Sequence, residues 1–168
     1  MAPRVILIGP PGSGKSTVGQ ALAAAMRVPF ADTDEAIEAE AGIPIGDIFV
    51  QHGEPHFRKL ERAAVQRALL THPGVLALGG GAITDAETRS DLSEHRVVFL
   101  DVSLAEAAHR VGLDTSRPLL LGNVRGQLKA LMDARRPLYE QIAAYTVDSS
   151  TGTPEEIAAR IVTLLEAA

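Results

Sequence analysis

The chain has 168 residues, 46% of them hydrophobic, which fits one domain of ordinary size with a sizeable core. A net charge of -5 at pH 7 argues against a general attraction to nucleic acid or to an anionic membrane surface. Because cysteine is absent, a disulfide framework, a thiolate metal site and a cysteine nucleophile are excluded. No segment has the pattern of a signal peptide or of a membrane span. We therefore expect a cytoplasmic protein without nucleic-acid or membrane partners.

A phosphate-binding motif directly follows the first apolar run, Val5–Ile8. Residues 9–17 read Gly-Pro-Pro-Gly-Ser-Gly-Lys-Ser-Thr, which fits the pattern G-x-x-x-x-G-K-[ST]. In such a loop, backbone N–H groups surround a phosphate, the lysine reaches the β- and γ-phosphates, and the serine hydroxyl binds Mg²⁺. An ordinary glycine-rich turn would not require the Lys-Ser-Thr sequence in this register. The motif thus predicts a nucleoside triphosphate site that includes Gly12, Ser13, Gly14, Lys15, Ser16 and Thr17.

Short apolar runs alternate with helical patterns along the chain, which is typical of βαβ units and a parallel sheet. The predicted strands are Val5–Ile8, Pro29–Ala31, Val75–Leu78, Val97–Val102 and Tyr145–Val147. The predicted helices lie near Lys15–Met26, Glu35–Ala41, Pro55–Leu70, Ala86–Leu92, Leu104–Val111, Gln127–Ala143 and Glu155–Glu166. The pattern favours an α/β fold with five strands.

Two carboxylates follow the second predicted strand, in the sequence Asp32-Thr33-Asp34. Ligands of open parallel sheets bind at the carboxyl ends of strands, so both carboxylates are candidates for the site. One can face Mg²⁺ while the other faces an acceptor molecule. Asp34 equally suits the N-cap of a helix that begins at Glu35.

The long helix that begins near Pro55 carries Phe57, Arg58 and Glu61. Phe57 belongs to an apolar stripe, so it can be a core residue alone. Arg58 and Glu61 share one helix face. They form either an exposed ion pair or an anion-binding arginine that a carboxylate orients, and spacing alone leaves both alternatives open.

Two further strand ends carry unusual residues. Gly79-Gly80-Gly81 follows the third predicted strand, and three glycines indicate close approach of a ligand to the backbone. Asp101 near the end of the fourth strand resembles a metal-binding aspartate, but we favour a turn-initiating role before Ser103. The five histidines show no metal-binding spacing.

The stretch 112–126 is too rich in glycine and proline for a helix and too polar for a core strand. A loop of this length is commonly a functional lid, and the alternative is a disordered surface insertion. Positive charges gather in and around it, which suits a phosphate enzyme as well as a solvated helix face. They are Arg110, Arg117, Arg125, Lys129, Arg135 and Arg136.

Taken together, six motifs resemble those of the shikimate kinase family, in order and at the family's spacing. They are Gly9–Thr17, Asp32-Thr33-Asp34, Gly53-Glu54 with Phe57-Arg58 and Glu61, Gly79-Gly80-Gly81, Arg117-Pro118-Leu119, and Arg135-Arg136-Pro137-Leu138-Tyr139. The resemblance implies transfer of the γ-phosphoryl group of ATP to the 3-hydroxyl of shikimate, with Mg²⁺, in aromatic amino-acid biosynthesis. It also implies a P-loop NTPase fold like that of nucleoside monophosphate kinases, with strand order 2-3-1-4-5.

The resemblance also implies roles for individual residues. Shikimate would be bound by Asp34, Arg58, Gly79, Gly80, Gly81 and Arg135. Arg136 takes the variable position of the Arg-x-Pro-Leu-Tyr pattern and is the reserve candidate. Ser16 and Asp32 would hold Mg²⁺, while Lys15, Asp34 and Arg117 would act in catalysis. Arg110 and Pro154 would flank adenine, and Arg117 would reach the ATP phosphates from the lid.

The chain departs from the family's pattern at one loop. The family often has a basic residue in the segment that here reads Ser-Ser-Thr-Gly-Thr, Ser149–Thr153, so the adenine contacts there are open. We expect one kinase domain over 1–168, with a substrate region at about 32–61, a mobile lid at about 112–126, and a monomeric state. Gluconate and nucleoside monophosphate kinases, or a nucleotide-dependent switch that hydrolyses ATP slowly, are the alternatives.

Overall fold

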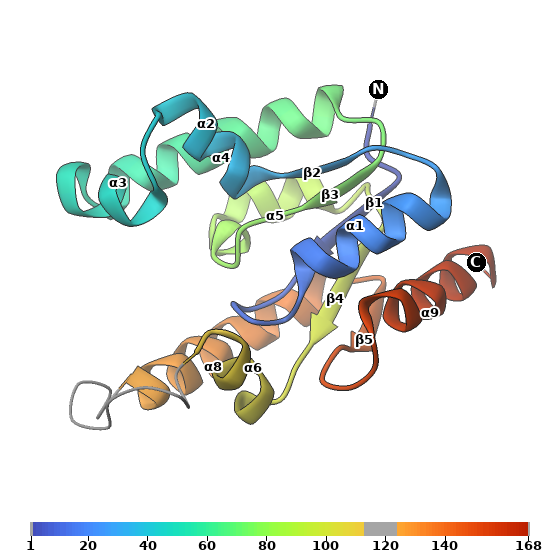
Figure 1. The fold of residues 1–168 in the computed structure, drawn as a ribbon. Coiled ribbons are helices and arrows are strands. Elements are labelled where there is room, and N and C mark those ends of the chain that lie inside the picture. The colour runs from blue at the N-terminus through green and yellow to red at the C-terminus, as the bar shows by residue number, and fades with distance from the viewer. Residues whose placement is uncertain (1, 113–123, 168) are drawn as a thin grey trace.

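The computed structural model describes residues 2–112 and 124–167. Its centre is a parallel sheet of five strands in the order β2-β3-β1-β4-β5 (Figure 1). The strands are β1 Val5–Ile8, β2 Phe30–Asp32, β3 Val75–Ala77, β4 Val97–Asp101 and β5 Tyr145–Asp148. The alternating pattern correctly predicted the parallel sheet, and the order implied by the resemblance is confirmed.

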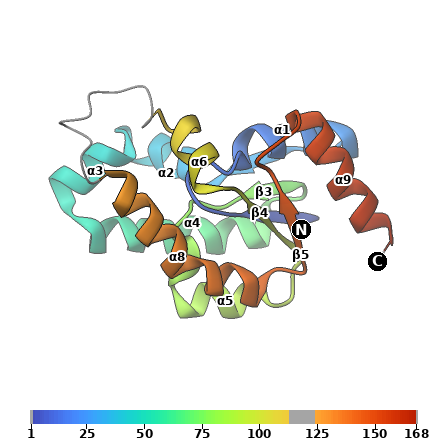
Figure 2. The same cartoon turned by 90° about the horizontal axis from the view of Figure 1, so that it is seen from below.

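Helices cover both faces of the sheet, which is why β1 is apolar at every position and fully buried. Successive side chains of a strand point to opposite faces. Val5 and Leu7 therefore pack against α1 (Lys15–Met26) and α9 (Pro154–Ala167), while Ile6 and Ile8 pack against α4 (Glu54–Thr71), α5 (Ala86–Leu92) and α8 (Val124–Ile142). Figure 2 shows α1 and α9 on one side of the strands and α4, α5 and α8 on the other.

A third cluster of apolar residues lies outside these two layers, under α2 (Thr33–Ala41), α3 (Ile45–His52) and α4. Its buried members are Ile37, Ile48 and Phe57. The ring of Phe57 contacts that of Phe49 with centroids 4.8 Å apart, so the core role considered for Phe57 is correct. The sequence did not predict α3, whose eight residues follow Pro44.

The start of α2 corrects one expectation. Asp32 is the N-cap, because its Oδ1 accepts a hydrogen bond from the Asp34 N–H at 2.8 Å. The helix accordingly begins at Thr33 and not at Glu35, and the N-cap role considered for Asp34 is wrong. Asp34 thus has a side chain that is not used by the helix end.

The segment expected to be a lid is only partly described. Residues 113–123, which include Arg117, lie outside the described residues. Residues 124–126 belong to α8, which begins at Val124 rather than at Gln127. Upstream of this segment, α6 (Leu104–Arg110) follows β4, and a short 3₁₀ helix η1 (Ala82–Thr84) follows β3. Over the ranges 2–112 and 124–167, no helix is long and apolar enough to cross a membrane.

Candidate active site

The carboxyl ends of β1, β2 and β3 bring three of the sequence motifs to one edge of the sheet. The phosphate loop follows β1, Asp34 lies in the first turn of α2 directly after β2, and the Gly79–Gly81 turn follows β3. A cavity of about 540 Å³ lies among them, and its lining residues include Lys15, Ser16, Asp32, Asp34 and Gly80. This edge of the sheet is therefore the candidate active site.

The phosphate loop depends on glycine at two positions with left-handed backbone, Gly12 with φ 81° and Gly14 with φ 89°. A Cβ atom on Gly12 would also lie 2.7 Å from the Ala107 carbonyl oxygen of α6. The ammonium group of Lys15 is held inside the loop and donates to the carbonyls of Gly9 at 2.7 Å and Pro10 at 3.0 Å. Burial lowers the pKa of Lys15 to about 8, although Asp34 and Asp32 oppose this shift.

Ser16 and Asp32 form a pair that suits a magnesium ion. The Ser16 hydroxyl donates to Asp32 Oδ2 at 2.8 Å, so the two predicted metal ligands already lie in contact. In the described part of the chain, no group of three or more His, Cys, Asp or Glu side chains could hold a metal. Mg²⁺ typically binds through one or two carboxylates together with waters and substrate phosphates, so this sparse donor set fits it.

The Asp34 side chain does not cap α2, because Asp32 does so. The Oδ1 atom of Asp34 is buried and receives no hydrogen bond from any described residue. Burial, followed by the charge of Asp32, raises the pKa of Asp34 to about 6, and Lys15 opposes the shift. Gly79 permits this position, since a Cβ atom there would overlap with Asp34 Oδ1. A carboxylate of this kind can accept a hydrogen bond and a proton from a bound hydroxyl.

Two arginines converge on Gly81. A Cβ atom on Gly81 would lie 2.6 Å from both terminal nitrogens of Arg58 and 2.9 Å from Nη2 of Arg135. Arg58 donates from Nη1 to Glu61 Oε1 at 2.7 Å, and the Glu61 side chain is only 5% exposed. The pair is thus not an exposed ion pair but an arginine oriented by a buried carboxylate. Two guanidinium groups at one glycine form a site for an anion such as a carboxylate.

The side chain of Arg136 points away from the glycine turn. Its two terminal nitrogens donate to the two carboxylate oxygens of Asp101 at 2.7 and 2.8 Å, and Glu140 lies at 2.6 Å from its Nε. Asp101 is therefore a partner for α8. The turn-initiating role that we favoured for Asp101 is not what the structure shows, because Ser103 caps α6. The structure brings Arg135, and not Arg136, to the glycine turn.

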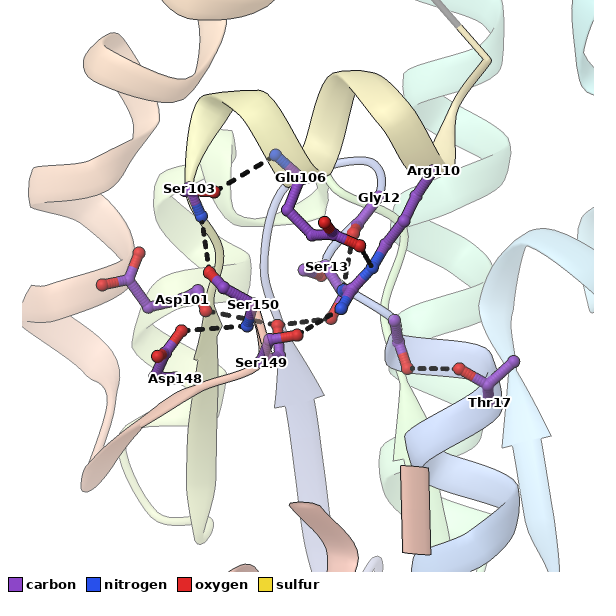
Figure 3. A network of polar contacts seen from close by, with 11 residues as sticks. Gly12, Ser13, Thr17, Asp101, Ser103, Glu106, Arg110, Asp148, Ser149 and Ser150 are labelled. Carbon is purple, nitrogen blue, oxygen red and sulfur yellow. Dashed lines mark hydrogen bonds and ion pairs between the residues drawn. The ribbon is translucent and has the colours of Figure 1, made fainter. Parts of the chain in front are cut away.

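The nucleotide end of the site contains a network of polar contacts between the phosphate loop, α6 and the loop after β5 (Figure 3). Arg110 donates to the carbonyl of Gly12 at 3.1 Å and to that of Ser149, and its Nε contacts Glu106. The buried Ser149 hydroxyl donates to the Ser13 carbonyl at 2.7 Å. Arg110 therefore lies between the two loops, where the resemblance implies adenine, and Pro154 begins α9 at the end of the second loop.

Comparison with known proteins identifies the family. The family model for shikimate kinase matches residues 11–166. The shikimate kinase of Thermobifida fusca is 57% identical over 166 residues, which cover 99% of this chain and 96% of that protein. The chain belongs to the shikimate kinase family. A relative from Salinispora arenicola, also named shikimate kinase, is 53% identical over 99% of this chain and 100% of its own length.

Solved structures agree with this membership. Shikimate kinase from Acinetobacter baumannii in complex with shikimate is 36% identical and covers 99% of this chain and 94% of its own, with a TM-score of 0.91. A gluconokinase from Sinorhizobium meliloti is 22% identical with a TM-score of 0.58, so its likeness is one of fold alone. The gluconate alternative considered from sequence therefore has far weaker support than the shikimate kinase family.

The structure adds contacts at this site that the motifs did not reveal. Arg160 of α9 donates to the carbonyls of Asp148 at 3.1 Å and Thr151 at 3.5 Å, so a basic residue from a helix reaches the loop that lacks one of its own. The Thr33 hydroxyl accepts from the Gly79 N–H at 3.1 Å. The only signal for Thr33 in the sequence was its position between the two candidate aspartates.

We predict that Ser149→Ala lowers the free energy of unfolding by about 1–3 kcal/mol, because it removes a buried hydroxyl that joins the phosphate loop to β5. Urea unfolding measures this change. The matched control is Ser93→Ala, whose exposed hydroxyl contacts only its own helix end at the Ser90 carbonyl and should change stability by less than about 0.5 kcal/mol. Equal effects of the two substitutions would contradict a special role for the Ser149 contact.

Proposed function

We propose that this chain transfers the γ-phosphoryl group of ATP to the 3-hydroxyl of shikimate, which yields shikimate 3-phosphate and ADP in the biosynthesis of chorismate and aromatic amino acids. Membership of the shikimate kinase family supports the reaction class. The observation that carries the proposal is the convergence of Arg58 and Arg135 at Gly81, on the same edge of the sheet as Asp34 and the phosphate loop. The site thus pairs an anion-binding end with a phosphate-binding end.

The two ends would divide the work of binding. Shikimate carries a carboxylate, and the guanidinium groups of Arg58 and Arg135 supply donors for it at the glycine turn. The missing side chain of Gly79 lets the Asp34 carboxylate lie against the turn, so the acceptor would meet Asp34 beside these donors. The phosphate loop would hold ATP, with Arg110 and Pro154 beside the adenine. The acceptor and donor would meet between Asp34 and Lys15.

Phosphoryl transfer requires positioning and charge neutralisation more than covalent chemistry. Asp34 would orient the attacking hydroxyl and accept its proton through Oδ1, which receives no hydrogen bond from any described residue. Lys15 would leave its loop carbonyls to contact the transferring phosphate. Ser16 and Asp32 would hold Mg²⁺, which when bound neutralises phosphate charge. Arg117 stays a prediction as the lid arginine, as do the monomeric state and the cytoplasmic location.

A turnover assay with alternative acceptors tests the function. ADP formation from Mg-ATP is measured with shikimate, with gluconate, with nucleoside monophosphates and without any acceptor. We expect ADP formation to depend on shikimate, because its rigid ring holds the carboxylate for Arg58 and Arg135 at a fixed separation from the hydroxyl that Asp34 would orient. ADP release at the same rate without an acceptor would instead support the ATP-hydrolysing switch, and a preference for gluconate would support the other kinase class.

The arginines give a test of the anion site. Arg58→Gln and Arg135→Gln should each raise the shikimate KM, through loss of about 1.5–3 kcal/mol of charged hydrogen bonding, and leave the KM for ATP nearly unchanged. Arg136→Gln is the matched control, since its guanidinium binds Asp101, and its shikimate KM should stay within about twofold of wild type. A larger effect at Arg136 than at Arg135 would show that the assignment is off by one residue.

Asp34 and Lys15, whose pKa values are shifted, predict the acid and the alkaline side of the pH dependence of kcat/KM. Asp34 must be ionised to act as a base, and burial raises its pKa in the protein without Mg²⁺ and ATP to about 6, so kcat/KM for shikimate at saturating Mg-ATP should fall on the acid side of the profile. Lys15 must be protonated to bind phosphate, so kcat/KM for ATP should fall as the pH rises through about 8. Steady-state rates from about pH 5 to about pH 9 measure both limbs. A shikimate profile that is flat across the acid range would exclude Asp34 as the base.

A further inference from the structure

The Gly79–Gly81 turn is fixed by hydrogen bonds from three separate elements. Thr33 of α2 accepts from the Gly79 N–H at 3.1 Å, and Thr84 of η1 donates to the Gly81 carbonyl at 2.6 Å. The middle residue is held from α8, where the Tyr139 hydroxyl donates to the Gly80 carbonyl at 2.6 Å. Because glycine has no side chain to restrict its backbone, these bonds determine the conformation of the turn.

Tyr139 is rigidly placed for this contact. The residue is 1% exposed, and its ring stacks on that of Phe99 in β4 with centroids 5.0 Å apart. Arg135 lies four residues earlier in α8, so the two side chains lie on one helix face. The Arg135 guanidinium would be 2.9 Å from a Cβ on Gly81 and 3.5 Å from a Cβ on Gly80. One helix therefore reaches the turn twice, through the hydroxyl and through the guanidinium.

Gly80 also borders the phosphate loop. A Cβ atom on Gly80 would lie 3.3 Å from Pro11 Cδ and 3.4 Å from the Gly9 carbonyl. The residue that Tyr139 holds is thus placed between the arginine and the nucleotide loop. A small rotation of its peptide group would change the distance from the turn to Arg135.

We propose that Tyr139 is a positioning residue for the substrate carboxylate: its hydroxyl sets the position of the Gly79–Gly81 turn relative to the guanidinium of Arg135. The inference rests on the proposed function, because it assigns the carboxylate of shikimate to this arginine. Tyr139 itself does not contact the reacting atoms. Its effect on the reaction is transmitted through the Gly80 carbonyl and the side chain four residues before it.

The hydroxyl keeps its proton at every pH used for an assay. Burial raises the pKa of Tyr139 to about 12, and the positive charge of the neighbouring Arg135 only partly opposes this. Tyr139 therefore serves as a hydrogen-bond donor and not as an acid or a base. Replacing it should change the strength of binding without changing the shape of the pH profile.

The test is Tyr139→Phe in the full chain, which removes the hydroxyl and keeps the ring on Phe99. We expect a rise of about three- to tenfold in the shikimate KM, with kcat and the KM for ATP within about twofold of wild type. The matched control is Tyr145→Phe, since Tyr145 begins β5 at the opposite end of the strands from the site, and its kinetics should match wild type. An unchanged shikimate KM in Tyr139→Phe would overturn the proposal.

A double-mutant cycle separates positioning from simple loss of structure. In an Arg135→Gln background, Tyr139→Phe should add less than about a twofold rise in the shikimate KM, because the guanidinium that it positions is gone. An equal rise in both backgrounds, or a matching rise in the KM for ATP, would show a general structural role and overturn the proposal. If the melting temperature falls, shikimate titration by calorimetry at a temperature where all variants are folded replaces the kinetics.

These outcomes are distinct from failure of the proposed function. Absence of shikimate-dependent ADP formation by the wild-type chain would refute the function, and with it the substrate on which this inference depends. An active wild type with a kinetically identical Tyr139→Phe variant would refute the positioning role alone. The comparison of the two tyrosine variants against one wild-type preparation distinguishes the cases.

Discussion

Both carboxylate oxygens of Asp32 are engaged, and the arrangement of the site depends on this one side chain. Oδ2 accepts from Ser16 in the phosphate loop, and Oδ1 accepts from the backbone N–H at the start of α2. Asp32 thereby ties the nucleotide loop to the helix that carries Asp34. Since the residue is also the last of β2, its position follows from the pairing of Asp32 with Ala77 in β3. The register of β2 on β3 thus fixes where Ser16, Asp32 and Asp34 lie relative to one another.

The same edge of the sheet concentrates charge in a way that folding alone would not favour. Asp34 is half-buried close to Asp32, with its Oδ1 buried, and Glu61 is buried with Arg58 as its partner. A carboxylate that receives no hydrogen bond from the described residues is unfavourable in a folded protein, because it loses hydration without a replacement. Such local cost is expected where a group must remain available for a substrate, and it is offset by the apolar layers on both faces of the sheet.

The sequence predicted the elements whose signal is local. An apolar run followed by the phosphate-loop pattern indicates a strand, a loop and a helix in that order. Both β1 and α1 have the predicted bounds. The helix start after β2 was misplaced because two aspartates offer the same capping group, and only strand pairing decides between them. The helix α3 was missed because it is short and lies between Pro44 and Gly53.

Neighbouring residues on a helix point about 100° apart, so the structural choice between Arg135 and Arg136 depends on which face of α8 is buried. The pattern that ends in the aromatic Tyr139, four residues after Arg135, was the signal in the sequence that favoured Arg135.

The strand order has a consequence for how the chain is built. The central strand β1 hydrogen-bonds to β3 on one side and to β4 on the other. Val5 is paired with Val75 of β3, and Ile6 is paired with Val97 of β4. The phosphate loop therefore cannot gain its final support until β4, which ends at Asp101, has been synthesised. Until then the four consecutive apolar residues Val5–Ile8 have at least one edge without a partner strand, since β3 is complete at Ala77 and β4 only at Asp101. The phosphate loop precedes both strands that support it, so it is completed late, and contacts between segments distant in the sequence limit how fast it reaches its final conformation.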